Sequence, residues 1–363
     1  MAVSQLKPPT PEPAAPVRLP HWRRRALSIV TLVLILIVAA GFAATIGSVK
    51  VPFLTTVRIL LSRLPFAGIT PDWQASMETI ILTIRLPRVI LAGLVGAALS
   101  IAGAAYQGLF RNPMADPYLI GVAQGAALGA VTGFLLPFHG TGFGFGMIPL
   151  LAFIGAVLSV VIVYLLARVG RTLPVTTLIL AGVALGSLWG SMVSYLVITS
   201  GDKIRGIITW LMGSFSLSQW SEVRLVFPYV LVGVIVILLY GRSLNVMQLD
   251  EEQAQQLGID VEKVKLILLA AATLITAAAV SFVGIIGFVG IVIPHIVRLI
   301  WGPDHRLLLP LSVLVGAIFM IVADLLARTL LAPTEIPVGI ITAFCGVPFF
   351  LYLLRRKKQA VFF

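Results

Sequence analysis

Charged residues are scarce in this sequence, because Asp, Glu, Lys and Arg make up only 11% of its 363 residues. A soluble domain carries about 25% of such residues, so this chain cannot cover a water-facing surface of ordinary composition. Hydrophobic residues account for 59% of the chain, and apolar runs of nearly membrane-spanning length recur along it. A helix of about 20 apolar residues crosses the hydrocarbon layer of a bilayer. The composition therefore predicts an all-α, polytopic membrane protein.

Cysteine and catalytic motifs are also nearly missing. The single cysteine, Cys345, excludes an internal disulfide framework and a cysteine-cluster metal site. No Gly-Lys dipeptide occurs, so the phosphate-binding loop G-x-x-x-x-G-K-[ST] is absent, as is the zinc motif H-E-x-x-H. His295 follows Pro294 without a second ligand at metal spacing, and we interpret it as structural. We predict no catalytic residue, no cofactor and no metal site, and the usual machinery for ATP hydrolysis is missing.

Acidic residues are outnumbered, and the net charge is +12. On a soluble protein this excess points to nucleic acid. On a membrane protein it is typical of Lys and Arg in cytoplasmic loops. We therefore attribute the positive charge to cytoplasmic loops and predict the lipid bilayer, and no nucleic acid, as a partner of the chain.

The two ends of the chain differ from its middle. Residues 1–25 are rich in proline and lack an apolar core, which predicts a disordered cytoplasmic tail. Arg23–Arg25 precedes an apolar run too long for a signal peptide. We expect one transmembrane domain over residues 26–358, and a short C-terminal tail over residues 359–363.

Ten apolar segments are expected to span the membrane. They are Ala26–Gly47, Val89–Leu109, Tyr118–Leu136, Met147–Ala167, Pro174–Thr199, Leu225–Tyr240, Val264–Val283, Phe288–Ile300, Leu307–Ala327 and Pro337–Leu354.

The seventh and eighth spans come from one run without charge, Leu266–Val297, which is too long for a single crossing. Gly284, Gly287 and Gly290 mark a turn in its middle. With this turn, both basic chain ends lie on the cytoplasmic side of the inner membrane, in agreement with the positive-inside rule. The resulting topology permits an inverted repeat of spans two to five in spans seven to ten.

Two outer segments, Val51–Arg85 and Gly201–Ser221, are long enough for short interfacial helices. On the inner side, the segment 245–262 is the most polar. Asp250 is a suitable N-cap and Gly258 a suitable C-terminal stop, which predicts a short helix exposed to the cytosol. This helix either docks on a partner or only connects two spans, and the spacing alone does not separate these alternatives.

Span two carries small residues at every fourth position, a pattern that lets helix backbones approach closely. These residues are Ala92, Gly96, Ser100, Ala104 and Gly108. We interpret the stripe as packing, with span two in the centre of the bundle. The segment Arg111–Pro117 follows, with two prolines and an Asn that predict an irregular turn at membrane depth. This turn is either a gate or an ordinary tight loop.

Asp324 and Arg328 lie four residues apart near the outer end of span nine. Charges within a membrane span are functional candidates. A simple internal i, i+4 ion pair is an equal alternative.

Several segments occur together in an order that is characteristic of one transporter family. They are Arg85-Leu86-Pro87-Arg88, Gly96-Ala97-Ala98-Leu99, Gln107-Gly108-Leu109-Phe110-Arg111-Asn112-Pro113-Met114-Ala115-Asp116-Pro117, Trp210-Leu211-Met212-Gly213-Ser214, Gly287-Phe288-Val289-Gly290-Ile291-Val292-Ile293-Pro294-His295-Ile296-Val297-Arg298, Asp304-His305-Arg306 and Glu335-Ile336-Pro337-Val338-Gly339. From about Thr83 to Arg355 the chain resembles the FecCD-like permeases of type II ABC importers for iron-siderophores, haem and cobalamin.

The resemblance implies ten helices in each subunit, a homodimer or pseudo-dimer with a central pathway, two cytoplasmic ATP-binding subunits and an extracytoplasmic substrate-binding protein. It also implies roles for particular residues. The inner gate or pathway would include Asn112, Met114 and Thr176; the ATPase-coupling helix Glu251, Ala254, Leu257 and Gly258; and the docking site for the binding protein Arg85, Arg88 and Arg328. The proline-rich tail departs from the family pattern.

Three functions are compared for this chain. The first is the permease subunit of an importer for a metal chelate, with an iron(III)-siderophore as the first choice and cobalamin or haem as alternatives. The second is a secondary transporter, which needs ion-coupling groups near the midplane, where acidic residues are nearly absent. The third is a membrane-embedded enzyme, which is disfavoured because no nucleophile–base pair or metal cluster occurs.

Overall fold

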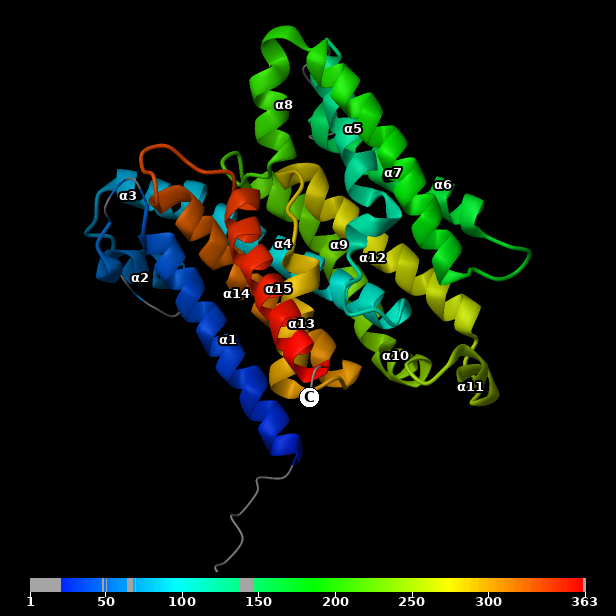
Figure 1. Cartoon of the computed structure of the whole chain (residues 1–363). Helices are drawn as coiled ribbons and strands as arrows, with labels where there is room; N and C mark the ends of the chain where they lie inside the picture. Colours follow the sequence, from blue (N-terminus) through cyan, green and yellow to red (C-terminus); the bar gives the residue numbers. More distant parts are fainter. Residues whose placement is uncertain are drawn as a thin grey trace, which may run out of the picture.

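The computed structural model describes residues 21–47, 49, 51–63, 68, 70–137 and 146–361, and the named elements within these ranges are all helices (Figure 1). The main helices are α1 (His21–Thr45), α4 (Leu86–Leu109), α5 (Val122–Leu135), α6 (Met147–Ala167), α7 (Val175–Ile198), α9 (Trp220–Leu239), α12 (Val261–Val283), α13 (Val289–Trp301), α14 (His305–Thr329) and α15 (Val338–Val361). Each coincides with one of the ten predicted spans. Seven meet the length of a membrane crossing, with α4 as part of a longer helix, and α5, α13 and the apolar part of α15 are shorter.

Helix α4 occupies the centre of the bundle, as the stripe of small residues predicts. It packs against α9, α12, α13 and α14, and most of its surface is buried. A Cβ atom on Gly96 would collide with the carbonyl of Gly316 in α14, and one on Gly103 would collide with the carbonyl of Gly290 in α13. The absence of side chains therefore allows both neighbouring backbones to approach α4 directly.

The helix that contains α4 begins much earlier than predicted. Helix α3 (Ala75–Thr79) and a π-helical turn, η1 (Ile80–Arg85), continue into α4, so the helix runs over Ala75–Leu109. Pro87 has no N–H group for the carbonyl four residues before it, and a π turn is a common response to such a defect. Arg85 and Arg88 therefore lie within one continuous helix of the bundle, and not in a separate segment before it.

The predicted turn between spans seven and eight is confirmed. Residues 284–287 between α12 and α13 are not helical, and the backbone takes positive φ angles at Gly284 (79°) and Phe288 (70°). Gly284 suits this conformation because it has no Cβ, and a Cβ there would also collide with the carbonyl of Trp210.

Span three differs from its prediction at its beginning. Residues Pro117–Ile120 form a 3-10 turn, η2, and Gly121 then takes a φ angle of 84° before α5 starts. The side chain of Asp116 accepts a hydrogen bond from the N–H of Tyr118 (2.7 Å) and caps this turn. A tight turn and a left-handed residue therefore replace the first helical turn that we expected.

Short helices occupy both predicted outer segments and the polar inner segment. They are α2 (Phe53–Leu61), the 3-10 turn η3 (Gly201–Lys203), α8 (Ile204–Leu211), α10 (Gly241–Met247) and α11 (Glu251–Gln256). At the N-terminus, α1 already starts at His21, within the predicted tail, and residues 1–20 of that tail lie outside the described residues.

Candidate functional site

The short helix α11 lies at one end of the bundle, beside the start of α12 (Figure 1). Its N-terminus is capped by Asp250, whose carboxylate accepts a hydrogen bond from the N–H of Glu251 (2.7 Å). At its other end Gly258 takes a φ angle of 84°. Both predicted helix-ending signals are therefore confirmed.

The four predicted coupling residues of this segment have different surroundings. Leu257 is 65% exposed, whereas Ala254 is completely buried against the core. Gly258 borders open space. Glu251 is paired with a lysine of α12. Leu257 therefore presents an apolar contact surface, while Ala254 holds the helix from the inside.

That lysine, Lys265, is a residue that the sequence analysis missed. Its ammonium group is buried and donates hydrogen bonds to Glu251 (2.7 Å), to Glu262 (3.1 Å) and to the carbonyl of Leu173 (3.2 Å). Glu262 in turn accepts a hydrogen bond from the N–H of Leu173 (2.8 Å). Lys265 therefore joins α11 to the segment that leads into α7. A buried lysine normally requires such partners. The sequence does not reveal which lysine is buried, because Lys263 and Lys265 both lie at the start of α12 and only Lys265 is buried.

The predicted gate turn is irregular, as expected, and it contacts the same short helix. Arg111 has a φ angle of 50°, and the side-chain oxygen of Asn112 accepts a hydrogen bond from the N–H of Met114 (2.9 Å). Arg111 forms an exposed ion pair with Asp250 (3.3 Å). The amide of Gln248 donates a hydrogen bond to the carbonyl of Gly108 (2.8 Å). These contacts connect the turn to the segment that contains α11.

The side chains proposed for the gate are accessible. Met114 is 46% exposed, and Asn112 is also exposed. Thr176 is exposed at the start of α7, three residues after Leu173. Both parts of the predicted gate are therefore linked to α11, one through Asp250 and the other through Lys265. Within the gate turn, burial raises the pKa of Asp116 to about 6.

The three arginines proposed for docking lie at the opposite end, and their side chains are buried. Arg88 holds both carboxylate oxygens of Asp324 through Nε (3.0 and 3.1 Å) and Nη2 (2.8 Å). Its third nitrogen, Nη1, donates to Glu335 (2.9 Å), in the loop before α15. Arg328 also lies near Asp324, with 3.6 Å between Nε and Oδ2. The i, i+4 pair is therefore present, but Arg88 is the stronger partner of Asp324.

Arg85 and Arg328, the other arginines of this cluster, bind backbone carbonyls at the end of α1. Arg85 donates hydrogen bonds to the carbonyls of Ala44, Thr45 and Val49, and Arg328 donates to the carbonyl of Ala43. The last carbonyls of a helix have no partner within it, and a positive charge suits that end. Arg85 and Arg328 therefore fix the end of α1 to the bundle, and each of them is only 5% exposed.

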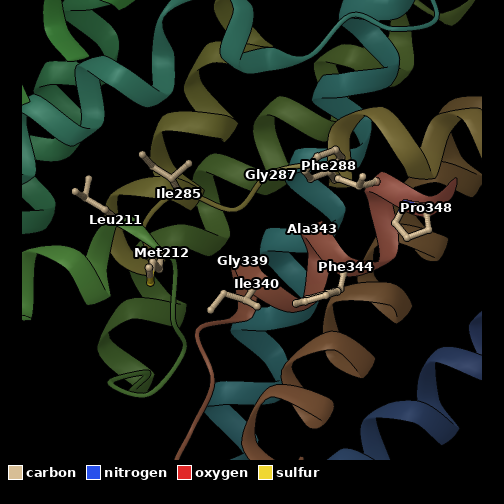
Figure 2. Close-up of a pocket in the computed structure, with 11 residues that line it drawn as sticks. Leu211, Met212, Ile285, Gly287, Phe288, Gly339, Ile340, Ala343, Phe344 and Pro348 are labelled. Atoms are coloured by element: carbon tan, nitrogen blue, oxygen red, sulfur yellow. The ribbon is translucent and has the colours of Figure 1, made fainter. Parts of the chain in front are cut away.

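A cavity of about 670 Å³ opens between α8, the loop after α12, and α15 (Figure 2). Its lining residues are all apolar or glycine: Leu211, Met212, Ile285, Gly287, Phe288, Gly339, Ile340, Ala343, Phe344, Val347 and Pro348. Figure 2 shows that α15 contributes one wall, while Leu211, Met212 and Ile285 lie across from it.

Three motif segments that are far apart in the sequence meet at this cavity. The N–H groups of Val338 and Gly339 donate to the carbonyls of Gly213 (3.0 Å) and Met212 (3.2 Å). The N–H of Ser214 donates to the carbonyl of Val283 (2.8 Å), just before the turn between α12 and α13. The order of these motifs along the sequence therefore reflects one local structure.

The sequence pattern of the FecCD transport family matches residues 32–356. The chain belongs to this family. Members of the FecCD family are permeases, so the chain is a multi-pass membrane permease of a type II ABC importer for metal chelates.

Individual members of the FecCD family cover nearly the whole chain. The cobalamin import system permease protein of Halobacterium salinarum is 46% identical over 331 residues, which are 89% of this chain and 86% of that protein. The hemin transport system permease protein of Yersinia pestis is 40% identical, covering 90% of this chain and 95% of that protein. A metal-chelate type ABC transporter solved in an inward-facing conformation superimposes with a TM-score of 0.77 and is 31% identical, covering 91% of this chain and 99% of that one.

Proposed function

We propose that this chain and a second permease subunit form the pathway of a cell-membrane importer that moves a metal chelate into the cytoplasm. Two copies of a separate subunit hydrolyse ATP, and an extracytoplasmic protein delivers the chelate. The single observation that carries this proposal is the double connection of α11. One ion pair joins it to the gate turn at Asp250, and Lys265 joins it to the segment before α7. A subunit that moves α11 can thereby act on both parts of the gate.

The ATP-binding subunit is proposed to contact the exposed side of the segment Glu251–Gly258. Leu257 is its largest exposed apolar side chain, and an exposed leucine beside polar residues is suited to a pocket on a partner. In this arrangement Glu251 and Ala254 hold the helix on the permease, and Gly258 allows the chain to turn away from the contact.

The outer arginines are proposed to meet acidic residues of the binding protein. Their burial adds a condition, since Arg88 must loosen its bond to Glu335 before it can pair with a carboxylate of another protein. A matched test compares Arg88→Lys, which keeps the charge but loses the planar fork, with Arg205→Lys at an exposed outer position. We expect weaker capture of the binding protein only in Arg88→Lys, and equal capture in both variants contradicts the docking role.

A corrinoid is the cargo that we propose within the metal-chelate class. The cavity beside α15 lacks polar side chains and does not by itself separate a corrinoid, which carries amide groups, from haem. The relative named for cobalamin import has the higher identity of the two permeases compared above, 46% against 40% for the hemin permease. An iron(III)-siderophore, the first choice from the sequence, remains a competing cargo in the experiment below.

Both chain ends are proposed to face the cytoplasm. This orientation places α11 inside and η3 outside. Single cysteines at Gln255 and Asp202, both exposed, test it in a Cys345→Ser background. We expect an impermeant thiol reagent added to intact cells to label position 202 alone. Labelling of position 255 alone reverses the proposed topology.

The decisive experiment reconstitutes the permease with its ATP-binding subunit and binding protein in proteoliposomes. Uptake of radiolabelled cobalamin, haem and a ferric siderophore is measured with ATP, and with an ion gradient instead of ATP. We expect ATP-dependent uptake of cobalamin above the other two chelates. ATP-dependent uptake of another chelate corrects the cargo, while uptake driven by the ion gradient alone rejects the importer in favour of a secondary transporter.

A further inference from the structure

Two cavities adjoin each other along helices α6 and α12. The first, which we name the polar cavity, has a volume of about 550 Å³ and lies where α6 ends and α12 begins. The second, the apolar groove, has a volume of about 210 Å³ and continues along the same two helices. Tyr164 and Leu266 line both. The two spaces therefore form one amphipathic cleft.

The polar cavity contains three basic side chains, Arg168, Arg171 and Lys263. Among the described residues, Arg168 uses only its Nε atom, which donates a hydrogen bond to the carbonyl of Gly170 (3.0 Å). Arg171 lies in a tight turn, and Arg168 directly precedes it. The turn is closed by a pair of hydrogen bonds between Val169 and Thr172 (both 3.0 Å). The turn presents both guanidinium groups from a fixed backbone.

The acidic side chains of the polar cavity are already engaged within the chain. Asp260 accepts a hydrogen bond from the N–H of Lys263 (3.1 Å) and caps α12. Glu262 is shared by Lys265 and the N–H of Leu173. The basic groups that remain available in the cavity therefore favour an anionic guest, and arginines pair well with phosphate.

The apolar groove extends from the polar cavity towards the middle of the membrane span. On α12 it reaches from Leu266 to Leu274, which is about 12 Å at the rise of an α-helix. On α6 it is lined by Val157, Val160, Val161 and Tyr164. Thr273 lies near the end farthest from the polar cavity, and its hydroxyl group is hydrogen-bonded to the hydroxyl of Tyr106 (3.1 Å). Every other lining residue except Tyr164 is purely aliphatic.

We propose that this cleft binds an anionic phospholipid, with the phosphate headgroup in the polar cavity and one acyl chain in the apolar groove. Basic pockets between transmembrane helices are suited to anionic headgroups, and an aliphatic groove at hydrocarbon depth accepts an acyl chain without burying a polar group. The order of the two parts matches the order of a lipid, with the charged part at the helix ends. This proposal does not depend on the cargo or on the direction of transport.

Headgroup binding by the polar cavity is tested with the purified full chain in detergent. Native mass spectrometry counts the retained lipid. Phosphatidylglycerol and phosphatidylcholine with identical acyl chains are added in equal amounts. We expect preferential retention of phosphatidylglycerol, and about a fivefold loss of its affinity in each of Arg171→Gln and Lys263→Gln. Arg242→Gln, an exposed arginine in α10 outside the cleft, is the matched control and should retain the lipid.

The groove part is tested with Val161→Trp, which fills the apolar groove from an exposed position, and with Leu158→Trp on the same helix outside it. Only Val161→Trp should reduce lipid retention. Glycerol 3-phosphate, which has no acyl chain, should compete poorly with the lipid. Equal retention of the two phospholipids overturns the proposal. So does equal retention in both Trp variants, full competition by glycerol 3-phosphate, or release of lipid when two chains associate, which would make the cleft a subunit contact.

Discussion

The two ends of this permease both carry clusters of charged residues, but they use them differently. At the end that we propose to face outwards, here named the outer end, Arg88 and Asp324 are only 11% and 2% exposed, and their ion pair lies between transmembrane helices. At the opposite end, here named the inner end, the ion pair of Arg111 and Asp250 is 42% and 48% exposed and connects two turns. The outer cluster therefore fixes the packing of α1, α4 and α14, whereas the inner pair holds segments that water also solvates.

Arginine–aspartate pairs therefore have different energetic consequences at the two ends. Removing one partner of a buried ion pair leaves a charge without solvent, whereas an exposed pair contributes little because water replaces the lost partner. Lys265 is intermediate, since its own side chain is 3% exposed but Glu251 and Glu262 are 32% and 29% exposed. The inner end thus combines one buried cation with acids that water can reach.

The largest effect is expected for Asp324→Ala at the outer end. Arg88 and Arg328 would lose their shared carboxylate, and the free energy of unfolding should fall by about 3–5 kcal/mol. Asp250→Asn at the inner end keeps the helix cap and removes only an exposed pair, so it should cost less than about 1 kcal/mol. Denaturant unfolding in detergent measures both, and similar losses in the two variants would contradict the comparison.

A smaller loss of stability is expected for Lys265→Met. The carboxylates that remain can be hydrated, so the cost should be about 1–3 kcal/mol. In the reconstituted importer, the variant should still bind the ATP-binding subunit but transport less cargo per ATP hydrolysed, because α11 is no longer joined to the segment before α7. Arg242→Met, at an exposed position of α10, is the stability control. An unchanged ratio of transport to hydrolysis in Lys265→Met would rule out this connection.

Gly258→Ala changes only the backbone at the inner end. The φ angle of 84° is strained for alanine, although no atom lies within 4 Å of the added methyl group. The expected cost is about 1 kcal/mol. Gly190→Ala in the middle of α7 also adds a methyl group in open space, but in a helical backbone, so it should raise stability by roughly 0.5–1 kcal/mol. Thermal unfolding compares the two, and changes of the same sign would show that the turn is not constrained.

A pH-dependent effect is expected for Asp116 in the gate turn. Its pKa is raised by burial to about 6, above a value of about 3.9 in the unfolded chain. The folded chain therefore binds more protons than the unfolded chain between these values, and this group's contribution to stability falls as pH rises from 4 to 6. Asp116→Asn should remove that fall.

The melting temperature at pH 4.5 and pH 7 tests this expectation as a difference between the native chain and the variant. Asp304 does not interfere, because its hydrogen bonds with Arg306 lower its pKa and place its titration at a more acidic pH. The same pH response in the native chain and in Asp116→Asn would exclude Asp116 as its source.

The positions of the spans followed from the sequence because hydrophobicity is a local property. A run of apolar residues must be shielded from water whatever it packs against, so the ten helices and the turn at Gly284 were predictable. The caps of α11 were predictable for the same reason, since Asp250 and Gly258 act on their own neighbours. The inverted repeat remains a prediction.

The surroundings of the charged residues were decided by the tertiary structure. Arg88 meets Asp324 across 236 residues, and Arg328 meets Ala43 across 285 residues, so no spacing in the sequence reveals either contact. The positive-inside rule does not explain arginines at this end, since it counts charges and does not consider their partners. Burial of an arginine requires several acceptors at fixed positions, and only the packing of α1, α4 and α14 brings these acceptors together.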